Sequence, residues 1–437
     1  MRVYKQIPNE LETGLEAEDV APSQSDTFER HESGVRSYCR TFPMLIDRAQ
    51  GSYVYDVDGK RYLDFLCGAS SLNYGHNPPE LKRALVDYIA QDGVVNALDF
   101  HTRAKERFLR EFHRVILKPR ELDYRVQFCG PTGANAIEAA LKLAKKYTGR
   151  KSVVSFSNSY HGMSAGAMSV SSSFRRRNEE YLSPAWVNFL PFDGFTGQEN
   201  EIEFIRAMLT RPGSGYGVPA AFILELVQGE GGVNVASKPW VQALYRLSRE
   251  LNALFIVDDI QAGCGRTGRF FSFEHFEVVP DIVCMSKSIS GYGFPMSILL
   301  LNPTIDVWAP GEHNGTFRGF AYSFVTATEA LLQYWDRPDF ARALGEKSLL
   351  LARSLEQLRA RYPDAVERIN QLGLVCGIKF RSAEAAQRVQ RHCFENGLIV
   401  ESCGPDSATL KLLPPLTAGM DELEGGLRTL LAAMETA

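Results

Sequence analysis

Short hydrophobic runs alternate with amphipathic stretches through the middle of the 437-residue chain. Apolar runs that end in polar or glycine-rich residues predict buried strands, and stretches with apolar residues at helical spacing predict helices. The predicted strands cover residues 125–128, 152–156, 221–226, 255–257, 281–286 and 296–301. Helices are expected between them, at about 132–147 and 240–250. Strands that alternate with helices indicate the α/β class, with a mostly parallel central sheet flanked by helices.

The two ends of the chain predict a smaller α+β domain. Residues 53–65 alternate around Asp58-Gly59, a strong β-hairpin signal. The C-terminal part predicts a long helix at 339–361, strands at 374–380, 398–401 and 410–416, a helix at 383–395 and a final helix. We therefore expect a leader at 1–27, a small domain built from 28–78 and 332–437, and a large domain at 79–331.

Composition narrows the class of ligand. Hydrophobic residues make up 45% and charged residues 23% of the chain, and the formal net charge is −4. These values favour a small-molecule ligand over nucleic acid or an anionic membrane. Eight cysteines are scattered without a CxxC pair and mostly lie in apolar runs, which favours reduced thiols over disulfides or a zinc site. Together with a polar N-terminus, this predicts a cytoplasmic location.

A carboxylate and an amine are expected at one edge of the sheet. Asp258 and Asp259 follow the strand at 255–257, and Lys287 follows the strand at 281–286. Ligands of open α/β sheets bind beyond the carboxyl ends of the parallel strands. Pyridoxal 5'-phosphate (PLP) needs both groups: a lysine to form a Schiff base with its aldehyde and an aspartate to keep its ring nitrogen protonated.

Two other segments provide groups that suit the same cofactor. Thr132 is a candidate helix N-cap, so the amides of Gly133 and Ala134 could bind a phosphate at the positive end of a helix. Tyr160 or His161, after the strand at 152–156, could stack on a planar ring. Each feature alone is also typical of an ordinary helix start or of a core aromatic residue.

Two polar residues lie in glycine-containing loops. Glu230 follows the strand at 221–226 and is expected at the same sheet edge, where a solvated carboxylate is the ordinary alternative. Thr316, in HNGTFRG, could donate its hydroxyl to a phosphate.

Two motifs of nucleotide-binding proteins are incomplete. Residues 263–268 (GCGRTG) match the glycine fingerprint of dinucleotide-binding folds, but an aromatic run follows them where that fold needs a helix. A hydrophobic strand ending in Asp-Asp would suit an ATPase only beside a G-x-x-x-x-G-K-[ST] loop, and the sequence contains none.

In combination the motifs are specific. The sequence contains, in order, GPTGANAIEAA, SYHG, ELVQGEGG, VDDIQAGCGRTGRF, DIVCMSKSISGYGFP and HNGTFRG. In these motifs it resembles the class III PLP-dependent aminotransferases, from about Phe28 to the C-terminus, which implies PLP fold type I. The segments ESGVRSYCRTFP, LNYGHN, ALDFHT, ILKPRELDY, FVTAT and LKLLPPLT are most similar to the branch that acts on 2,4-diaminobutyrate and 2-oxoglutarate. That branch begins ectoine biosynthesis and also supplies siderophore and peptide pathways.

The resemblance implies roles for individual residues. Lys287 would bond covalently to the cofactor and serve as acid and base, and Asp258 would pair with the pyridine nitrogen. Gln261 would bond the phenolic oxygen of the ring, and Thr316 would reach the phosphate of the neighbouring subunit, which implies a homodimer with active sites at the interface. The cofactor-binding set is then Gly133, Ala134, Tyr160, His161, Asp258, Ile260, Gln261, Lys287 and Thr316.

The sequence departs from this family at two substrate-facing places. Glu230 matches a glutamate near the substrate that relatives pair with an arginine, and Lys411 replaces that arginine here. A lysine offers a point charge instead of a bidentate fork. The stretch 319–323 (GFAYS) replaces an asparagine-rich stretch. Glu230 and Lys411 are therefore the expected substrate-binding pair.

Other activities of the same fold remain open at this point. An aminomutase or racemase would use the same lysine and aspartate but would need no 2-oxoglutarate. Ornithine and 4-aminobutyrate aminotransferases share the same residues. A non-catalytic protein of this fold would lack the lysine or the aspartate, and both are present.

Overall fold

The computed structural model describes residues 25–172, 186–197 and 201–436. The chain divides into two units, residues 1–45 and 46–437, and the first contributes the short helices α1 (Ser25–His31) and α2 (Tyr38–Thr41). The predicted leader at 1–27 lies almost wholly outside the described residues. Within the described ranges, no helix has the length and apolar character that a membrane crossing requires.

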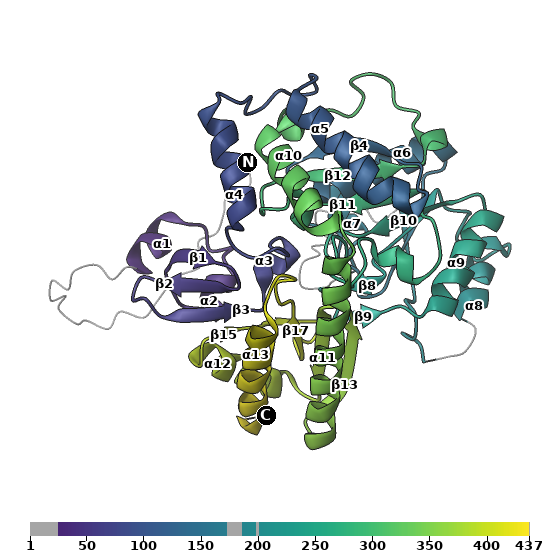
Figure 1. The fold of residues 1–437 in the computed structure, drawn as a ribbon. Coiled ribbons are helices and arrows are strands. Elements are labelled where there is room, and N and C mark those ends of the chain that lie inside the picture. The colour runs from purple at the N-terminus through teal and green to yellow at the C-terminus, as the bar shows by residue number, and fades with distance from the viewer. Residues whose placement is uncertain (1–24, 173–185, 198–200, 437) are drawn as a thin grey trace, which may run out of the picture. The chain divides into compact units, whose positions relative to one another are not determined.

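A seven-stranded sheet forms the centre of the second unit (Figure 1). Its strands, in spatial order, are β4 (Arg125–Gly130), β12 (Ser297–Leu301), β11 (Ile282–Met285), β10 (Leu254–Asp258), β7 (Ala221–Leu224), β5 (Val153–Phe156) and β6 (Val187–Leu190). Only β12 runs antiparallel to its neighbours β11 and β4. The segment between β11 and β12 is too short for a helical crossover, so β12 must reverse. The predicted mostly parallel α/β sheet is confirmed, with this one antiparallel strand.

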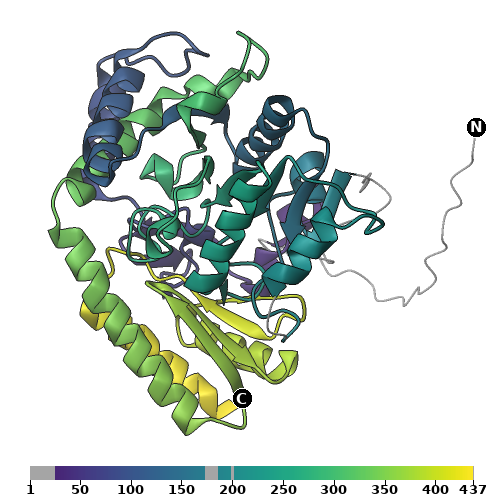
Figure 2. The same cartoon turned by 90° about the vertical axis from the view of Figure 1, so that its right-hand side faces the viewer.

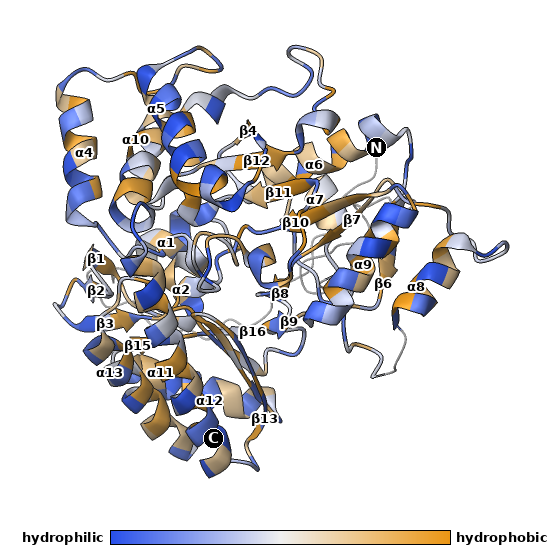
Figure 3. Ribbon diagram, turned by 45° about the vertical axis from the view of Figure 1, so that its right-hand side comes forward, coloured by the Kyte–Doolittle hydropathy of each residue, from blue (hydrophilic) through white to orange (hydrophobic). Residues whose placement is uncertain are grey.

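Helices cover both faces of this sheet. Along β10, Phe255 and Val257 belong to one hydrophobic cluster, whereas Leu254 and Ile256 belong to the other. Helix α6 (Gly133–Thr148) packs on the face of Ile256, and the opposite cluster includes residues of α5 (Arg103–Phe112), α9 (Lys238–Glu250) and α10 (Ala321–Ala330). Figure 3 shows the hydrophobic colour concentrated in the strands and hydrophilic residues on the outer sides of α8 (Glu201–Thr210) and α9. Burying each large apolar side chain contributes about 2 kcal/mol to this core.

Two smaller sheets are built from the two ends of the second unit. The first has the order β1 (Ile46–Gln50), β2 (Tyr53–Asp56), β3 (Arg61–Asp64) and β15 (Leu398–Ile399). Its β2–β3 pair is the predicted hairpin, and β15 pairs parallel to β3, so it joins distant parts of the sequence. The second has the order β13 (Val366–Leu372), β14 (Val375–Phe380), β17 (Thr409–Leu412) and β16 (Glu401–Cys403).

Helices pack around these two sheets. Helix α11 (Asp339–Arg361) packs beside α13 (Met420–Ala433), and Figure 2 shows the two running next to each other along the C-terminal sheet. Helix α12 (Ala383–Glu395) contacts three strands of that sheet. The remaining helices and strands are α3 (Cys67–Ser70), α4 (Pro79–Ala90), α7 (Ala165–Ser169), β8 (Val227–Gln228) and β9 (Asn234–Val235).

Three local expectations were incomplete. The predicted strand at 398–401 is two strands of different sheets, separated at the buried Val400. Strand β13 was not predicted because its sequence, VERINQL, is mostly polar. In α11, Leu349 is 58% exposed whereas Leu344 and Leu351 are buried, because Leu349 lies off the stripe that those two leucines form.

The GCGRTG motif joins parts of the chain that are distant in sequence. Arg266 is fully buried and donates hydrogen bonds to Oδ1 of Asn73 at 2.6 Å and to the carbonyls of Leu374 at 3.1 Å and Pro414 at 2.6 Å. A side chain at Gly373 would lie 2.2 Å from the backbone carbon of Thr267, so the two backbones are in close contact. A short 3-10 helix at Ser272–His275 follows the motif, in agreement with its exclusion as a dinucleotide site.

Candidate active site

One cavity of about 410 Å³ lies at the carboxyl ends of the parallel strands. Its volume is within the range that small-molecule and cofactor sites occupy. The residues that line it are Thr132, Gly133, Ala134, Tyr160, His161, Gly162, Met163, Ser164, Glu225, Glu230, Asp258, Ile260, Gln261 and Lys287. Eight of the nine predicted cofactor-binding residues are in this set.

Asp258 ends strand β10 at the wall of this cavity and is 4% exposed. Its Oδ2 accepts a hydrogen bond from Nδ1 of His161 at 2.7 Å, and its Oδ1 accepts one from the amide of Ile260 at 3.1 Å. The carboxylate is thus held by two donors at a fixed place. Nε2 of His161 is buried and has no hydrogen-bond partner among the described residues.

Lys287 enters the cavity from the neighbouring strand. It follows β11 after Ser286 and begins a short 3-10 helix, Lys287–Ser290. Its φ of +53° is a left-handed conformation that a non-glycine residue seldom adopts. Burial lowers the pKa of its ammonium, and the carboxylates of Glu230, Glu401 and Asp258 oppose that change. A lysine with a lowered pKa is a better nucleophile and proton carrier near neutral pH.

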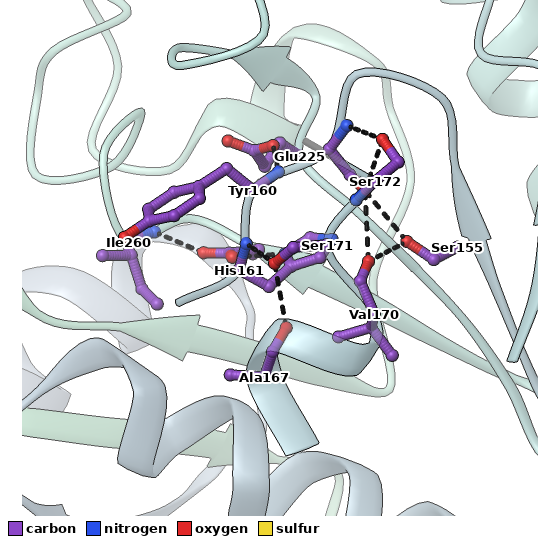
Figure 4. A network of polar contacts seen from close by, with 11 residues as sticks. Ser155, Tyr160, His161, Ala167, Val170, Ser171, Ser172, Glu225 and Ile260 are labelled. Atoms are coloured by element: carbon purple, nitrogen blue, oxygen red, sulfur yellow. Dashed lines mark hydrogen bonds and ion pairs between the residues drawn. The ribbon is translucent and has the colours of Figure 1, made fainter. Parts of the chain in front are cut away.

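A network of serine side chains holds the segment that carries Tyr160 and His161 (Figure 4). The amide of His161 donates to Oγ of Ser171 at 2.8 Å, and Ser171 in turn donates to the carbonyl of Ala167 at 2.9 Å. The amide of Ser159 donates to Oγ of Ser172 at 2.9 Å. Backbone and side-chain bonds therefore fix both predicted ring-contacting residues at the cavity.

The N-terminus of α6 forms another wall. Thr132 is the N-cap, and its amide donates to Oδ1 of Asn135 at 3.1 Å. Gly133 and Ala134 begin the helix, where backbone amides lack intrahelical partners and attract anions. The segment is closely packed, because a side chain at Gly133 would lie 2.8 Å from Cδ1 of Ile260.

Glu230 and Gln261 lie together at the cavity, with Lys411 behind them. Nε2 of Gln261 donates to Oε1 of Glu230 at 3.4 Å, and Oε1 of Gln261 is buried without a partner among the described residues. Nζ of Lys411 donates to Oε1 of Glu230 at 2.6 Å. Lys411 is fully buried and does not line the cavity, so it can act on a ligand only through Glu230 or after a change in their pairing.

Sequence reasoning missed Glu225 as a cavity residue. It follows β7 at the same sheet edge, is 6% exposed, and accepts a hydrogen bond from the amide of Tyr160 at 3.0 Å. Burial and the nearby charge of Asp258 raise the pKa of this carboxyl well above its ordinary value. Its place directly after a buried strand was the available signal, because Asp258 was predicted from the same pattern.

Asp259 is buried on the other side of the strand end, outside the cavity lining. Burial raises its pKa to about 7. The protonated form is therefore favoured in the folded protein, and this contribution to stability is lost as pH rises from about 4 through 7. We expect Asp259→Asn to stabilise the protein at pH 8 by about 2 kcal/mol and to have a much smaller effect at pH 5.

Urea unfolding of wild type and Asp259→Asn at both pH values measures this difference. A stability difference that is the same at pH 5 and pH 8 would contradict the shifted titration of Asp259.

Thr316 is the one predicted cofactor-binding residue that does not line the cavity of its own chain. It begins the 3-10 helix Thr316–Gly319 and is exposed. Its predicted contact with the phosphate of a neighbouring subunit stays a prediction.

The described residues fit PLP. The cavity holds an amine at Lys287, a carboxylate at Asp258 and a helix N-terminus for a phosphate. Two of its buried polar atoms, Nε2 of His161 and Oε1 of Gln261, lack partners among the described residues, so a bound polar ligand would have groups to satisfy.

Comparison with known proteins agrees with this geometry. Residues 35–434 match the Aminotransferase class-III family, and the chain therefore belongs to that family. It is a PLP-dependent aminotransferase with an α/β fold.

Individual relatives cover nearly the whole chain. It is 50% identical to the diaminobutyrate–2-oxoglutarate transaminase of Streptomyces avermitilis, over 94% of this chain and 98% of that protein. It is 47% identical to the enzyme of the same name from Halalkalibacterium halodurans, over 93% of this chain and 95% of the relative. Among solved structures, it is similar to the ornithine aminotransferase from Toxoplasma gondii ME49, with a TM-score of 0.81, 27% identity and 95% coverage of both chains.

Proposed function

We propose that this aminotransferase transfers the terminal amino group between L-2,4-diaminobutyrate and 2-oxoglutarate, forming aspartate 4-semialdehyde and glutamate, and that it also runs in reverse. The observation that carries the proposal is the near-50% identity, over almost the full length of both chains, to transaminases named for these two substrates. A cavity with an amine, a carboxylate and a substrate-facing glutamate is what such a reaction needs.

PLP, when bound, withdraws electrons from the substrate carbon whose proton must leave. We propose that Asp258, fixed by His161 and by the amide of Ile260, provides the negative charge that keeps the ring nitrogen protonated. Gly133 and Ala134 would bind the phosphate, and Gln261 would donate to the phenolic oxygen. Tyr160 would cover one face of the ring. The carboxylate of Glu225 positions Tyr160 by accepting a hydrogen bond from the backbone amide of Tyr160.

Lys287 would move the proton. Its pKa is lowered by burial, so a larger fraction of its amine is neutral near pH 8 than for an exposed lysine. The neutral nitrogen of Lys287 can then accept the proton that leaves the substrate carbon. It can afterwards donate this proton to the adjacent reacting atom.

We further propose a homodimer in which Thr316 of each subunit reaches the phosphate site of the other. Thr316 and the neighbouring Phe317, which is 60% exposed, are on a surface suited to a partner subunit.

The proposal also includes the domain division, the location and the pathway. We propose a small domain at 28–78 and 332–437, a large domain at 79–331, a cytoplasmic location and a role in ectoine or related synthesis. The β3–β15 pairing, which joins the two ends of the chain, supports the small domain. The eight described cysteines are free thiols, which supports the proposed location.

A panel of amino donors tests the proposed substrate. Purified enzyme with PLP and 2-oxoglutarate should form glutamate fastest from L-2,4-diaminobutyrate, and at least about tenfold more slowly from ornithine or 4-aminobutyrate, because a changed chain length misplaces the reacting amine. Faster reaction with ornithine or 4-aminobutyrate would reassign the enzyme within its class. Turnover of an amino acid without any 2-oxoglutarate would indicate an aminomutase or racemase.

A further inference from the structure

The short element α3 is wound in the left-handed sense. The φ angles of its residues are +55° at Cys67, +53° at Gly68, +54° at Ala69 and +69° at Ser70. The ψ angles of Gly68 and Ala69, 39° and 45°, also lie in the left-handed region. In the part of the chain that the structure describes, no other run of four consecutive residues has positive φ. L-amino acids adopt this conformation at a cost, so the surrounding structure must hold this left-handed turn in place.

Hydrogen bonds hold both ends of the left-handed turn. At its start, Oδ1 of Asp64 accepts from the amides of Leu66 at 2.9 Å and Cys67 at 2.8 Å. At its end, Oγ of Ser288 donates to the carbonyl of Ser70 at 2.7 Å. Both serines are almost fully buried, which strengthens this bond. The left-handed turn is therefore anchored to the segment that follows β11.

The hydroxyl of Ser288 makes a second bond to the same part of the chain. Its oxygen accepts from the amide of Asn73 at 2.9 Å. Asn73 is itself fully buried, and its side chain accepts from the guanidinium of Arg266 at 2.6 Å. Because the hydroxyl of Ser288 both donates and accepts, its orientation between the two backbone groups is fixed.

Ser288 directly follows Lys287 in the sequence. Lys287 has a φ of +53°, so the backbone that carries its amine is also held in a left-handed conformation. A second contact joins the left-handed turn to the cavity, because Nε2 of Gln261 donates to the carbonyl of Ala69 at 3.4 Å. None of the four residues of the turn is among the described residues that line the cavity. The turn therefore acts on the cavity through the residues that it contacts.

We infer that Ser288 is a positioning residue that holds the amine of Lys287 at its place in the cavity by tying the backbone of Lys287 to the left-handed turn. The inference rests on the proposed function, in which Lys287 bonds the cofactor and moves the proton. Without the hydroxyl, the backbone of Lys287 can relax toward ordinary angles, and its amine then moves away from the reacting carbon. A displacement of about 1 Å can lower a rate about a hundredfold.

Ser288→Ala in the purified holoenzyme tests the inference. We expect kcat to fall at least about tenfold while KM for 2-oxoglutarate stays within about twofold, because proton transfer depends on the position of the amine more than substrate binding does. Without substrate, the visible absorbance of the lysine–cofactor bond should titrate at a changed pH, since the surroundings of that nitrogen change. Ser288→Thr keeps the hydroxyl and should retain most of the activity and the titration of wild type.

Ser248→Ala is the matched control. Ser248 is also fully buried and donates to a backbone carbonyl, that of Tyr245 at 2.7 Å, but it lies in α9 and does not line the cavity. This variant should lower the free energy of unfolding without changing kcat or the absorbance titration. The inference is overturned if Ser288→Ala behaves like Ser248→Ala.

Variants of Ala69 repeat the test if Ser288→Ala does not fold. Ala69→Val leaves Ser288 unchanged but disfavours the left-handed turn, because a β-branched residue rarely adopts positive φ. Ala69→Gly fits the turn readily. The valine variant should change the absorbance titration, and the glycine variant should not. Equal titrations in these two variants would contradict the inference.

Lys287→Ala separates this inference from the proposed function. Visible absorbance that persists in Lys287→Ala would refute both the assignment of Lys287 and the role of Ser288. If the absorbance is lost in Lys287→Ala but Ser288→Ala changes neither kcat nor the titration, only the role of Ser288 fails.

Discussion

Lys287→Ala should reduce transamination by at least about ten-thousandfold, because in the proposed mechanism the same nitrogen bonds the cofactor and moves the proton. The structure places this lysine at the end of β11 in the wall of the cavity, and no other lysine lines that cavity among the described residues. The variant should also lack the visible absorbance that the lysine–cofactor bond gives to the wild-type protein. Initial rates of glutamate formation and the absorbance spectrum measure the two effects.

Lys151→Ala is a matched control, because Lys151 is exposed and does not line the cavity. It should keep both the rate and the spectrum of wild type. Transamination by Lys287→Ala at a rate near that of wild type would refute the assignment of Lys287.

Asp258→Asn should lower kcat by about a thousandfold, because it removes the negative charge that we propose holds the ring nitrogen protonated. The substitution keeps the size of the side chain, and the amide oxygen can still accept from His161, so the cavity should keep its shape. The pH dependence of the cofactor absorbance should change together with kcat, which a purely structural defect would not produce. Rates and spectra between pH 6 and 9 provide the measurement.

The adjacent residue offers the matched control for this variant. Asp259 is equally buried but does not line the cavity, so Asp259→Asn should leave kcat within a few-fold of wild type. Equal losses of activity in the two variants would show that the charge at Asp258 has no special role.

The fold could be predicted where single segments carry clear periodicity. The strands at 255–257 and 281–286 and the helix at 383–395 match β10, β11 and α12. The two strands are continuous apolar runs because both of their faces are buried, and the buried apolar residues of α12 share one face. The polar strand β13 and the break at Val400 were not predictable in this way. Both depend on pairing partners that are distant in sequence, and local pattern contains no signal of such partners.

The site was predictable to the extent that its residues follow buried strands or begin a helix. Asp258, Lys287 and the start of α6 could be placed at one edge by topology alone. The partners of Lys411 could not be predicted from the sequence, because the contact between Lys411 and Glu401 arises from the register of β16 and β17. Glu225 was not predicted because the apolar run at 221–226 places it inside the expected strand, whereas β7 ends at Leu224.

The buried guanidinium of Arg266 links the completion of the chain to its stability. Its acceptors at Leu374 and Pro414 follow it by 108 and 148 residues, and Asn73 precedes it by 193. A ribosome must therefore deliver nearly the entire polypeptide before this cation can donate to both of its carbonyl acceptors. Premature termination upstream of Pro414 would leave the buried guanidinium without at least one of its acceptors, so we expect truncated products to be destabilised and degraded.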